Sequence, residues 1–262
     1  MGFYELTKQK RIELTDTISR ELGKDFSSGK TGAIVRYFSD PDTYIRKTAY
    51  LATGKIFKTQ RVPVAKLAGS LVTLLASGNH HVRQTTVNAA GEIGIYDFEA
   101  VSDIFDKALF DHHHTVRNAV IGSVKKMAEK NPEPLLKWAN KYLTHPDSEA
   151  RKEICHGLEL RGRTHPQDVL PLLEKLQSDK KAVVRNMLIH VIGQISYKKG
   201  CLETVISALN KWGNRELVEK ALVEIVNVHR QYTRFSIYSQ EQAIAYIRKH
   251  SDIKLDTNKI TK

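Results

Sequence analysis

The sequence predicts an all-α fold, an α-solenoid (superhelix) of about six helical hairpins. The first observation is a repeat of nearly constant length, because five stretches of the chain align on one arginine. Successive arginines are 37, 34, 34 and 34 residues apart, at Arg46, Arg83, Arg117, Arg151 and Arg185. A sixth copy follows after another 34 residues, with Glu219 at the same position. Such a period is typical of arrays in which each unit packs on its neighbours.

The second observation is the helical spacing of apolar residues within each copy. In the fifth copy they fall at i, i+3, i+4, i+7, i+8 and i+11: Val184, Met187, Leu188, Val191, Ile192 and Ile195. This spacing places them on one face of an α-helix. A shorter amphipathic segment precedes each such helix, and a polar turn such as "SGNHH" or "HPDSE" joins the two. Each copy is therefore a helix, turn, helix unit.

These units resemble the HEAT-repeat family, whose copies carry an aspartate in the turn and an arginine early in the second helix. The resemblance covers about residues 30–230 and implies a single repeat domain over residues 1–262. Outside the repeats we expect an N-terminal helix at residues 4–22, a C-terminal cap at about 231–250 and a polar tail at 251–262.

The stretch "GKDFSSGKTG", residues 23–32, contains the Gly29-Lys30-Thr31 ending of a phosphate-binding loop. That motif has four residues between its glycines and follows a buried strand. Here the spacing is one residue too long, and the preceding apolar residues have helical spacing. We therefore expect no nucleotide cofactor, and a loop in which one of three residues caps the next helix: Ser27, Ser28 or Thr31.

The composition favours an anionic partner, since the chain contains 41 Lys and Arg but 29 Asp and Glu, which gives a formal net charge of +12. This excess suits nucleic acid, an acidic protein surface or an anionic membrane. No stretch has the length and apolarity of a transmembrane segment or the pattern of a secretory signal. Cys155 and Cys201 have no metal or redox spacing. We expect a reduced, soluble, cytoplasmic protein that needs no cofactor.

The repeated arginines have two interpretations. They can bind an anion together with other basic residues on or beside the second helices: Arg46, Arg83, Arg117, Arg151, Arg185, Lys47, Lys125, Lys152, Arg161 and Arg163. Alternatively they are internal clamps, because turn aspartates lie four to six residues before them: Asp40, Asp42, Asp111, Asp147 and Asp179. Guanidinium geometry favours bidentate pairing with a carboxylate, so the clamp interpretation is the stronger one.

The pattern breaks in the fourth repeat, where Glu153 and Arg161 occupy positions that are apolar in neighbouring copies. Departures of this kind tend to fall at functional or strained sites. Glu153 and His156 share a helix face, an arrangement that suits a metal ion or an acid/base pair. Two ligands are too few to indicate a metal site. A network of ion pairs is the simpler explanation of these charged residues. The histidines of the turns predict a polar, solvated surface, so we expect no metal site. Basic and aromatic residues alternate in "HRQYTRFSIY", residues 229–238, which suits single-stranded nucleic acid or an end cap.

Residues 115–195, with "TVRNAVIGSVKKMAEKNPEPLLKWANKYL" and "ARKEICHGLELRGRTHPQDVLPLL", are similar to the HEAT-like DNA alkylation repair family of the AlkD and AlkC type. The resemblance implies a basic surface that grips duplex DNA around an alkylated purine. The AlkD branch uses a Trp-Trp-Asp motif for its catalytic carboxylate, and this chain has no adjacent tryptophans. Glu153 and Glu159 are the candidates to replace that catalytic carboxylate, and they are so by conjecture alone.

The leading functional hypothesis is a non-catalytic scaffold that holds nucleic acid or an acidic protein segment. The first alternative is an alkylbase DNA glycosylase, and the second is an adaptor on an anionic membrane. Whether the chain is an enzyme stays open at this point, with binding preferred.

Overall fold

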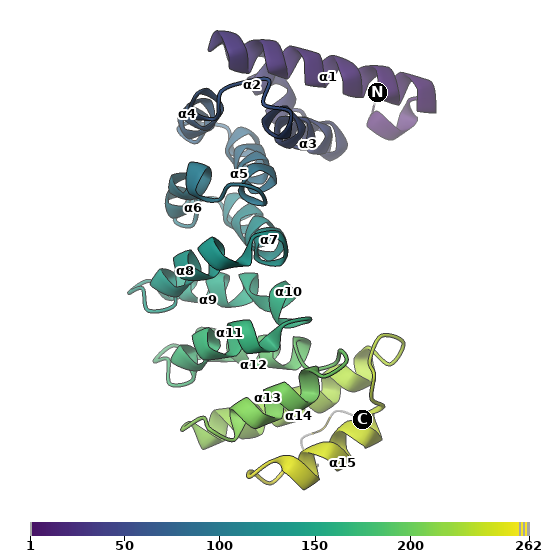
Figure 1. The fold of residues 1–262 in the computed structure, drawn as a ribbon, viewed down its shortest axis with the longest axis vertical. Helices are drawn as coiled ribbons and strands as arrows, with labels where there is room; N and C mark the ends of the chain where they lie inside the picture. The colour runs from purple at the N-terminus through teal and green to yellow at the C-terminus, as the bar shows by residue number, and fades with distance from the viewer. Residues whose placement is uncertain (1, 257, 259, 261–262) are drawn as a thin grey trace. The chain divides into compact units, whose positions relative to one another are not determined.

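The computed structural model describes residues 2–256, 258 and 260 (Figure 1). The described residues form helices, turns and loops, and they contain no β-strand. This confirms the predicted all-α helical-repeat fold. The chain forms two compact units, Met1–Pro134 and Leu135–Lys262. The single domain expected over residues 1–262 stays a prediction.

The N-terminal unit contains a row of second helices that pack side by side. Its elements, with η for 3-10 helices, are η1 (Phe3–Glu5), α1 (Lys8–Ser28), α2 (Gly32–Phe38), α3 (Thr43–Lys58), α4 (Val64–Leu74), α5 (His80–Gly94), η2 (Glu99–Val101), α6 (Ser102–Ala108) and α7 (His114–Lys130). Helix α5 packs between α3 and α7, while α4 and α6 form the other layer (Figure 1). Helix α1 packs against α3 and α4.

The C-terminal unit repeats the same two layers. Helix α8 (Pro132–Tyr142) crosses the boundary, and α9 (Ser148–Gly157), α10 (Glu159–Gly162), α11 (Pro166–Leu173), η3 (Glu174–Leu176), α12 (Ala182–Gln194), α13 (Cys201–Leu209), α14 (Arg215–Gln231) and α15 (Gln240–His250) follow. Helix α12 packs between α9 and α14, and α11 packs on α13. The fourth second helix is thus divided into α9 and α10, where its sequence departs from the repeat.

The polar turns define where the second helices begin. The Asn79 side chain accepts a hydrogen bond from the backbone N–H of His81 at 2.8 Å, and the Asp147 side chain accepts one from Glu149 at 2.7 Å. Such N-caps satisfy backbone donors that have no partner within the helix. The equivalent caps of other second helices are Asp42, His113 and Asn214.

The N-terminal helix differs from the predicted one at residues 4–22. Helix α1 begins after Thr7, whose hydroxyl accepts a hydrogen bond from Lys10, and continues to Ser28. It ends at Gly29, which has a φ of 76°, in the left-handed region that favours glycine. The "GKTG" loop therefore follows a helix, as predicted, and not a strand.

None of the three predicted caps of the following helix makes the expected hydrogen bond. Ser27 and Ser28 lie in the last turn of α1, and Thr31 precedes α2 without a side-chain hydrogen bond. Instead, Asp25 Oδ2 accepts hydrogen bonds from the backbone of Ala33 and Ile34, at 2.7 and 3.3 Å. The carboxylate reaches these groups because α1 continues to within four residues of α2.

Helix α15 packs on α13 and α14, at the place of the predicted C-terminal cap. In the predicted polar tail at 251–262, residues 257, 259, 261 and 262 lie outside the described part of the chain. Among the described helices, none combines the length and the apolar character needed to cross a bilayer.

Candidate functional site

Two of the repeated arginines form bidentate ion pairs with the turn of the next repeat. Arg83 donates from Nε to Asp111 Oδ2 at 2.7 Å and from Nη2 to Asp111 Oδ1 at 3.0 Å. Arg151 donates to Asp179 in the same way, at 2.5 and 2.9 Å. The Arg83 and Asp111 side chains are only 5% and 10% exposed. Burial raises the pKa of Asp111, but the hydrogen bonds from Arg83 and from the His113 N–H outweigh this effect and hold the pKa below its ordinary value.

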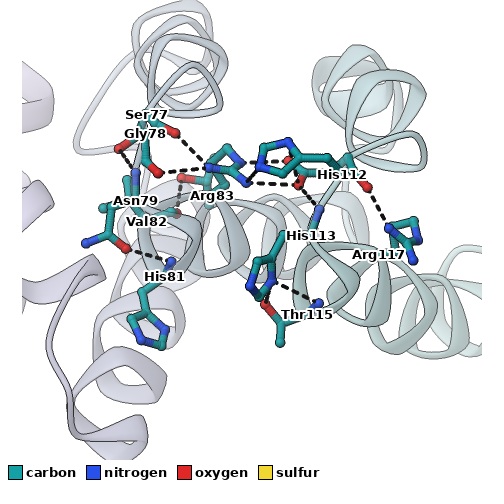
Figure 2. Close-up of polar contacts among 12 residues, drawn as sticks. Ser77, Gly78, Asn79, His81, Val82, Arg83, His112, His113, Thr115 and Arg117 are labelled. Atoms are coloured by element: carbon teal, nitrogen blue, oxygen red, sulfur yellow. Dashed lines mark hydrogen bonds and ion pairs between the residues drawn. The ribbon is translucent and has the colours of Figure 1, made fainter.

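The other three arginines bind main-chain carbonyl oxygens of the turn before their own helix. Arg117 Nη1 donates to Asp111 O at 2.8 Å, and Arg46 and Arg185 make the equivalent bonds to Asp40 and Asp179. Figure 2 shows the same inward direction for Arg83, which donates to Ser77 O at 2.9 Å. The turn before each helix thus holds its arginine through a carbonyl and not through the expected carboxylate. Where a carboxylate partner is present, it comes from 28 residues downstream. These five guanidinium groups therefore hold turns within the chain.

The remaining predicted anion-binding residues differ in their surroundings. Lys152 Nζ lies 2.5 Å from Glu149 Oε2 and 3.6 Å from Glu153 Oε1. Arg161 donates to Asp168, and Arg163 donates to Glu159 and, at 2.8 Å, to Gln194 Oε1. Lys125 is half-buried, whereas Lys47 is exposed. Much of the predicted positive charge is thus neutralised within the chain.

A groove of about 880 Å³ in the N-terminal unit has a different character. It lies between the C-terminal part of α1 and the C-terminal end of α3, and we call it the basic groove. Its wall carries five exposed cations: Arg20, Lys24, Lys30, Lys55 and Arg61. In the described part of the chain, none of the five has a carboxylate oxygen within 4.0 Å. The hydroxyl-bearing residues of its wall are Ser19, Ser27, Ser28 and Thr59.

Two acids share the wall of the basic groove, Asp16 and Asp25. Asp25 is already engaged by the two backbone N–H groups at the start of α2. The groove therefore keeps an excess of positive charge that no residue of the described chain neutralises by direct contact.

Sequence reasoning considered Lys55, on a second helix, among the basic residues but missed the other four groove cations, because they lie outside the second helices. Arg20, Lys24 and Lys30 belong to α1 and its following loop, and Arg61 follows α3. The two lysines of "GKDFSSGKTG" were the available signal. Their convergence with Lys55 depends on the packing of α1 on α3, which the repeat pattern does not predict.

The C-terminal unit contains a polar cluster around Glu159, which is 4% exposed. His156 Nε2 lies 3.3 Å from Glu159 Oε2, and Arg163 donates to Glu159 Oε1. His190 of α12 joins them, with its ring centroid 6.2 Å from that of His156. The predicted neighbour of His156 was Glu153, which the structure places beside Lys152 instead.

An aromatic and basic group lies at the end of the same unit. Lys198 Nζ lies 5.1 Å from the ring centroid of Tyr197 and 5.7 Å from that of Phe235. Phe235 is 64% exposed. Ile237 N donates to Tyr197 O at 3.1 Å, so the "HRQYTRFSIY" segment packs on the loop after α12. Cation–π contacts hold part of this segment in place.

The histidines of the second and third turns stack on one another. The ring centroids of His80 and His113 are 4.0 Å apart, and those of His80 and His81 are 4.1 Å apart. Figure 2 shows His112 beside Arg83, and His113 with its Nδ1 2.8 Å from the Thr115 hydroxyl. Desolvation, with the charges of Arg46 and His80, lowers the pKa of His81. These contacts join two turns that the sequence predicts as separate solvated loops.

Comparison with known proteins agrees with the fold. No protein-family model and no curated protein matches the chain. Its structure is similar to AlkD2 from Streptococcus mutans, with a TM-score of 0.50 and 16% identity over 79% of this chain and 97% of that chain. The smu.31 protein of Streptococcus mutans UA159 has a TM-score of 0.48 and 16% identity, over 79% of this chain and 97% of that chain. A computationally designed armadillo repeat protein for modular peptide recognition has a TM-score of 0.34 and 17% identity, over 73% of this chain and 97% of that chain.

The similarity to AlkD2 confirms, at the level of the fold alone, the resemblances to helical-repeat proteins and to the AlkD type that the sequence predicts.

Proposed function

We propose that the chain is a non-catalytic binding protein whose basic groove holds the phosphates of a nucleic acid. The observation that carries this proposal is the gathering of five exposed, unneutralised cations on one concave surface. Like charges that line one groove repel one another, and an anionic polymer relieves that repulsion. The resemblance to the DNA alkylation repair family agrees with a nucleic acid as the polymer.

Helix dipoles explain only part of this charge. Lys55 lies in the last turn of α3, where a cation is favoured by the helix dipole, whereas Lys24 lies before the last turn of α1. Arg20 lies two turns before the end of α1, and Arg61 lies beyond the end of α3, so the dipole effect does not account for them. A single anionic ligand that contacts all five groove cations is the simpler explanation for their presence in one groove.

The arginines and lysines of the groove suit the phosphates of a nucleic acid. Phosphate contacts in nucleic-acid complexes come from Arg and Lys together with Ser and Thr hydroxyls and backbone N–H groups. The basic groove supplies the first kind through residues such as Lys24 and Arg61. The hydroxyl groups of Ser27, Ser28 and Thr59 already donate to main-chain carbonyl oxygens. An acidic protein segment is the competing occupant.

The glycosylase alternative depends on Glu153 or Glu159. Both carboxylates are buried and bear ion-pair partners within the chain, Lys152 for Glu153 and Arg163 for Glu159. A carboxylate neutralised in this way is poorly suited to stabilise a cationic sugar intermediate, so we favour binding over catalysis.

The test is fluorescence anisotropy of a labelled DNA duplex at low salt, with two charge-matched triple variants. Reversal in the groove, Lys24→Glu with Lys55→Glu and Arg61→Glu, should weaken binding at least about tenfold, because each cation that no longer binds a phosphate lowers the affinity. Reversal at exposed lysines outside it, Lys10→Glu with Lys107→Glu and Lys130→Glu, removes the same charge and should weaken binding far less.

Equal weakening in the two variants would mean that binding follows net charge and not the groove. Failure of the unaltered chain to bind duplex or single strand would exclude nucleic acid, and binding of a labelled polyglutamate peptide would then identify an acidic protein segment. Release of an alkylated purine that Glu159→Gln abolishes would establish the glycosylase instead.

A further inference from the structure

Three side chains of known metal-binding chemistry converge in the C-terminal unit, far from the basic groove in sequence. His156 of α9, Glu159 of α10 and His190 of α12 each offer one ligand atom, and these atoms all lie within 4.8 Å of one another. His190 comes from the repeat after that of His156 and Glu159, so their spacing in the sequence gives no metal motif. The packing of α12 on α9 brings the three together.

The separations are close to those of a tetrahedral site. Zinc binds histidine nitrogen and carboxylate oxygen at about 2.0–2.2 Å, which puts neighbouring ligand atoms about 3.3–3.5 Å apart in a tetrahedron. His156 Nε2 and Glu159 Oε2 are 3.3 Å apart. Because every pair of ligand atoms is within 4.8 Å, a small rotation of the His190 ring, whose side chain is 44% exposed, closes the remaining distance.

Neighbouring groups orient these three side chains. Arg163 holds Glu159 through Oε1, and Gln194 accepts a hydrogen bond from the same arginine. This arrangement directs Glu159 Oε2 towards His156. Glu224 Oε1 lies 3.9 Å from His190 Nδ1, which is too long for a hydrogen bond. The same rotation of the His190 ring would bring Nδ1 towards this carboxylate, and a carboxylate commonly accepts a hydrogen bond from the outer nitrogen of a metal-bound histidine. The other nitrogen of His190, Nε2, is then the ligand.

We propose that His156, Glu159 and His190 form a binding site for a divalent transition-metal ion of the zinc type. Two imidazoles and one carboxylate suit Zn²⁺, Co²⁺, Ni²⁺ or Cu²⁺, whereas Mg²⁺ and Ca²⁺ prefer oxygen ligands alone. The His156 and His190 side chains are 30% and 44% exposed, so a fourth position faces solvent, where water or an anion completes the coordination. The ion ties the fourth repeat to the fifth.

The test is titration of the full chain with Co²⁺, followed by visible absorption and by competition with Zn²⁺. Tetrahedral Co²⁺ absorbs far more strongly than the hydrated ion, so the coordination geometry is read directly. We expect one equivalent to bind. His156→Gln and His190→Gln should each lower the affinity at least about tenfold, since even outer-shell partners affect metal binding by about 10–100-fold.

The chain has 11 histidines, so matched controls are needed. His80→Gln and His113→Gln alter the stacked histidines of the N-terminal unit and should leave the Co²⁺ spectrum unchanged. Circular dichroism of every variant checks that it is folded. If a ligand variant fails to fold, Glu224→Gln replaces it, and its affinity for Co²⁺ should be severalfold lower.

Absence of tetrahedral absorption at one equivalent would overturn the proposal. So would a spectrum that persists in folded His156→Gln and His190→Gln, or one that disappears in His113→Gln.

Discussion

Arg151 donates two hydrogen bonds to Asp179, 28 residues further along the chain, with Nε to Oδ2 at 2.5 Å and Nη2 to Oδ1 at 2.9 Å. Asp179 also accepts a hydrogen bond from the Lys181 N–H at 2.8 Å, just before α12 begins. One carboxylate therefore fixes the start of a helix and joins it to the preceding repeat. Arg83 and Asp111 form the same arrangement in the N-terminal unit.

The first prediction concerns the energy of this pair. Asp179→Asn should lower the free energy of unfolding by about 3 kcal/mol, because it leaves the nearly buried Arg151 charge without its counter-charge. Urea unfolding measures the decrease, and a double-mutant cycle with Arg151→Met isolates the coupling. The control is Glu216→Gln, which breaks an exposed pair with Lys220 and should cost less than about 1 kcal/mol. Equal effects at the two sites would contradict the clamp interpretation.

The second prediction is an acid-sensitive contribution to stability from the same carboxylate. Burial raises the pKa of Asp179, but hydrogen bonds from Arg151 and the Lys181 N–H outweigh it, and the net pKa lies below the ordinary value. The unfolded chain then binds the proton first as pH falls. The contribution is complete above the unfolded pKa of about 3.9 and is lost as pH falls through the folded pKa.

Urea unfolding at neutral pH and at about pH 3 checks this second prediction. The difference in unfolding free energy between the unaltered chain and Asp179→Asn should shrink at the lower pH. A difference that stays constant would show that the aspartate has the same pKa in both states.

The third prediction compares two glycines of the N-terminal unit. A Cβ at Gly54 in α3 would lie 2.5 Å from Glu92 Cβ in α5, an atom fixed to the backbone, whereas a Cβ at Gly122 in α7 would meet nothing within 4 Å. Gly54→Ala should therefore force the two helices apart and cost about 1–3 kcal/mol. Gly122→Ala should stabilise the chain by about 0.5–1 kcal/mol through helix propensity. Thermal unfolding of both variants checks the opposite signs.

The sequence predicts the fold because the periodicity of apolar residues and the spacing of the arginines are local properties of each repeat. The partner of each arginine is not local. Turn aspartates lie close before the arginines in sequence, yet the carboxylate that pairs with Arg83 belongs to the next turn, because stacking brings successive turns side by side.

The candidate sites depend still more on packing. Glu153 and Arg161 mark the break in the fourth repeat, the segment that also contains His156 and Glu159, but His190 looks like an ordinary polar residue on the outer side of its helix until α12 packs on α9. The basic groove likewise requires α1 to run six residues beyond its predicted end and to pack against α3. No repeat pattern contains this information.

The last prediction concerns salt, because direct phosphate contacts leave a quantitative signature. If all five groove cations contact phosphate, the logarithm of the affinity for duplex DNA should fall against the logarithm of salt concentration with a slope of about −4.5. Replacing Lys55 and Arg61 by Gln should reduce the magnitude of the slope by about 1.8, since each contact releases about 0.9 counterion. Lys107→Gln with Lys130→Gln, outside the groove, should leave the slope unchanged. Anisotropy titrations over a series of salt concentrations measure the slope for the unaltered chain and for the two double variants. Equal slopes for the three proteins would mean that the groove cations do not contact the phosphates.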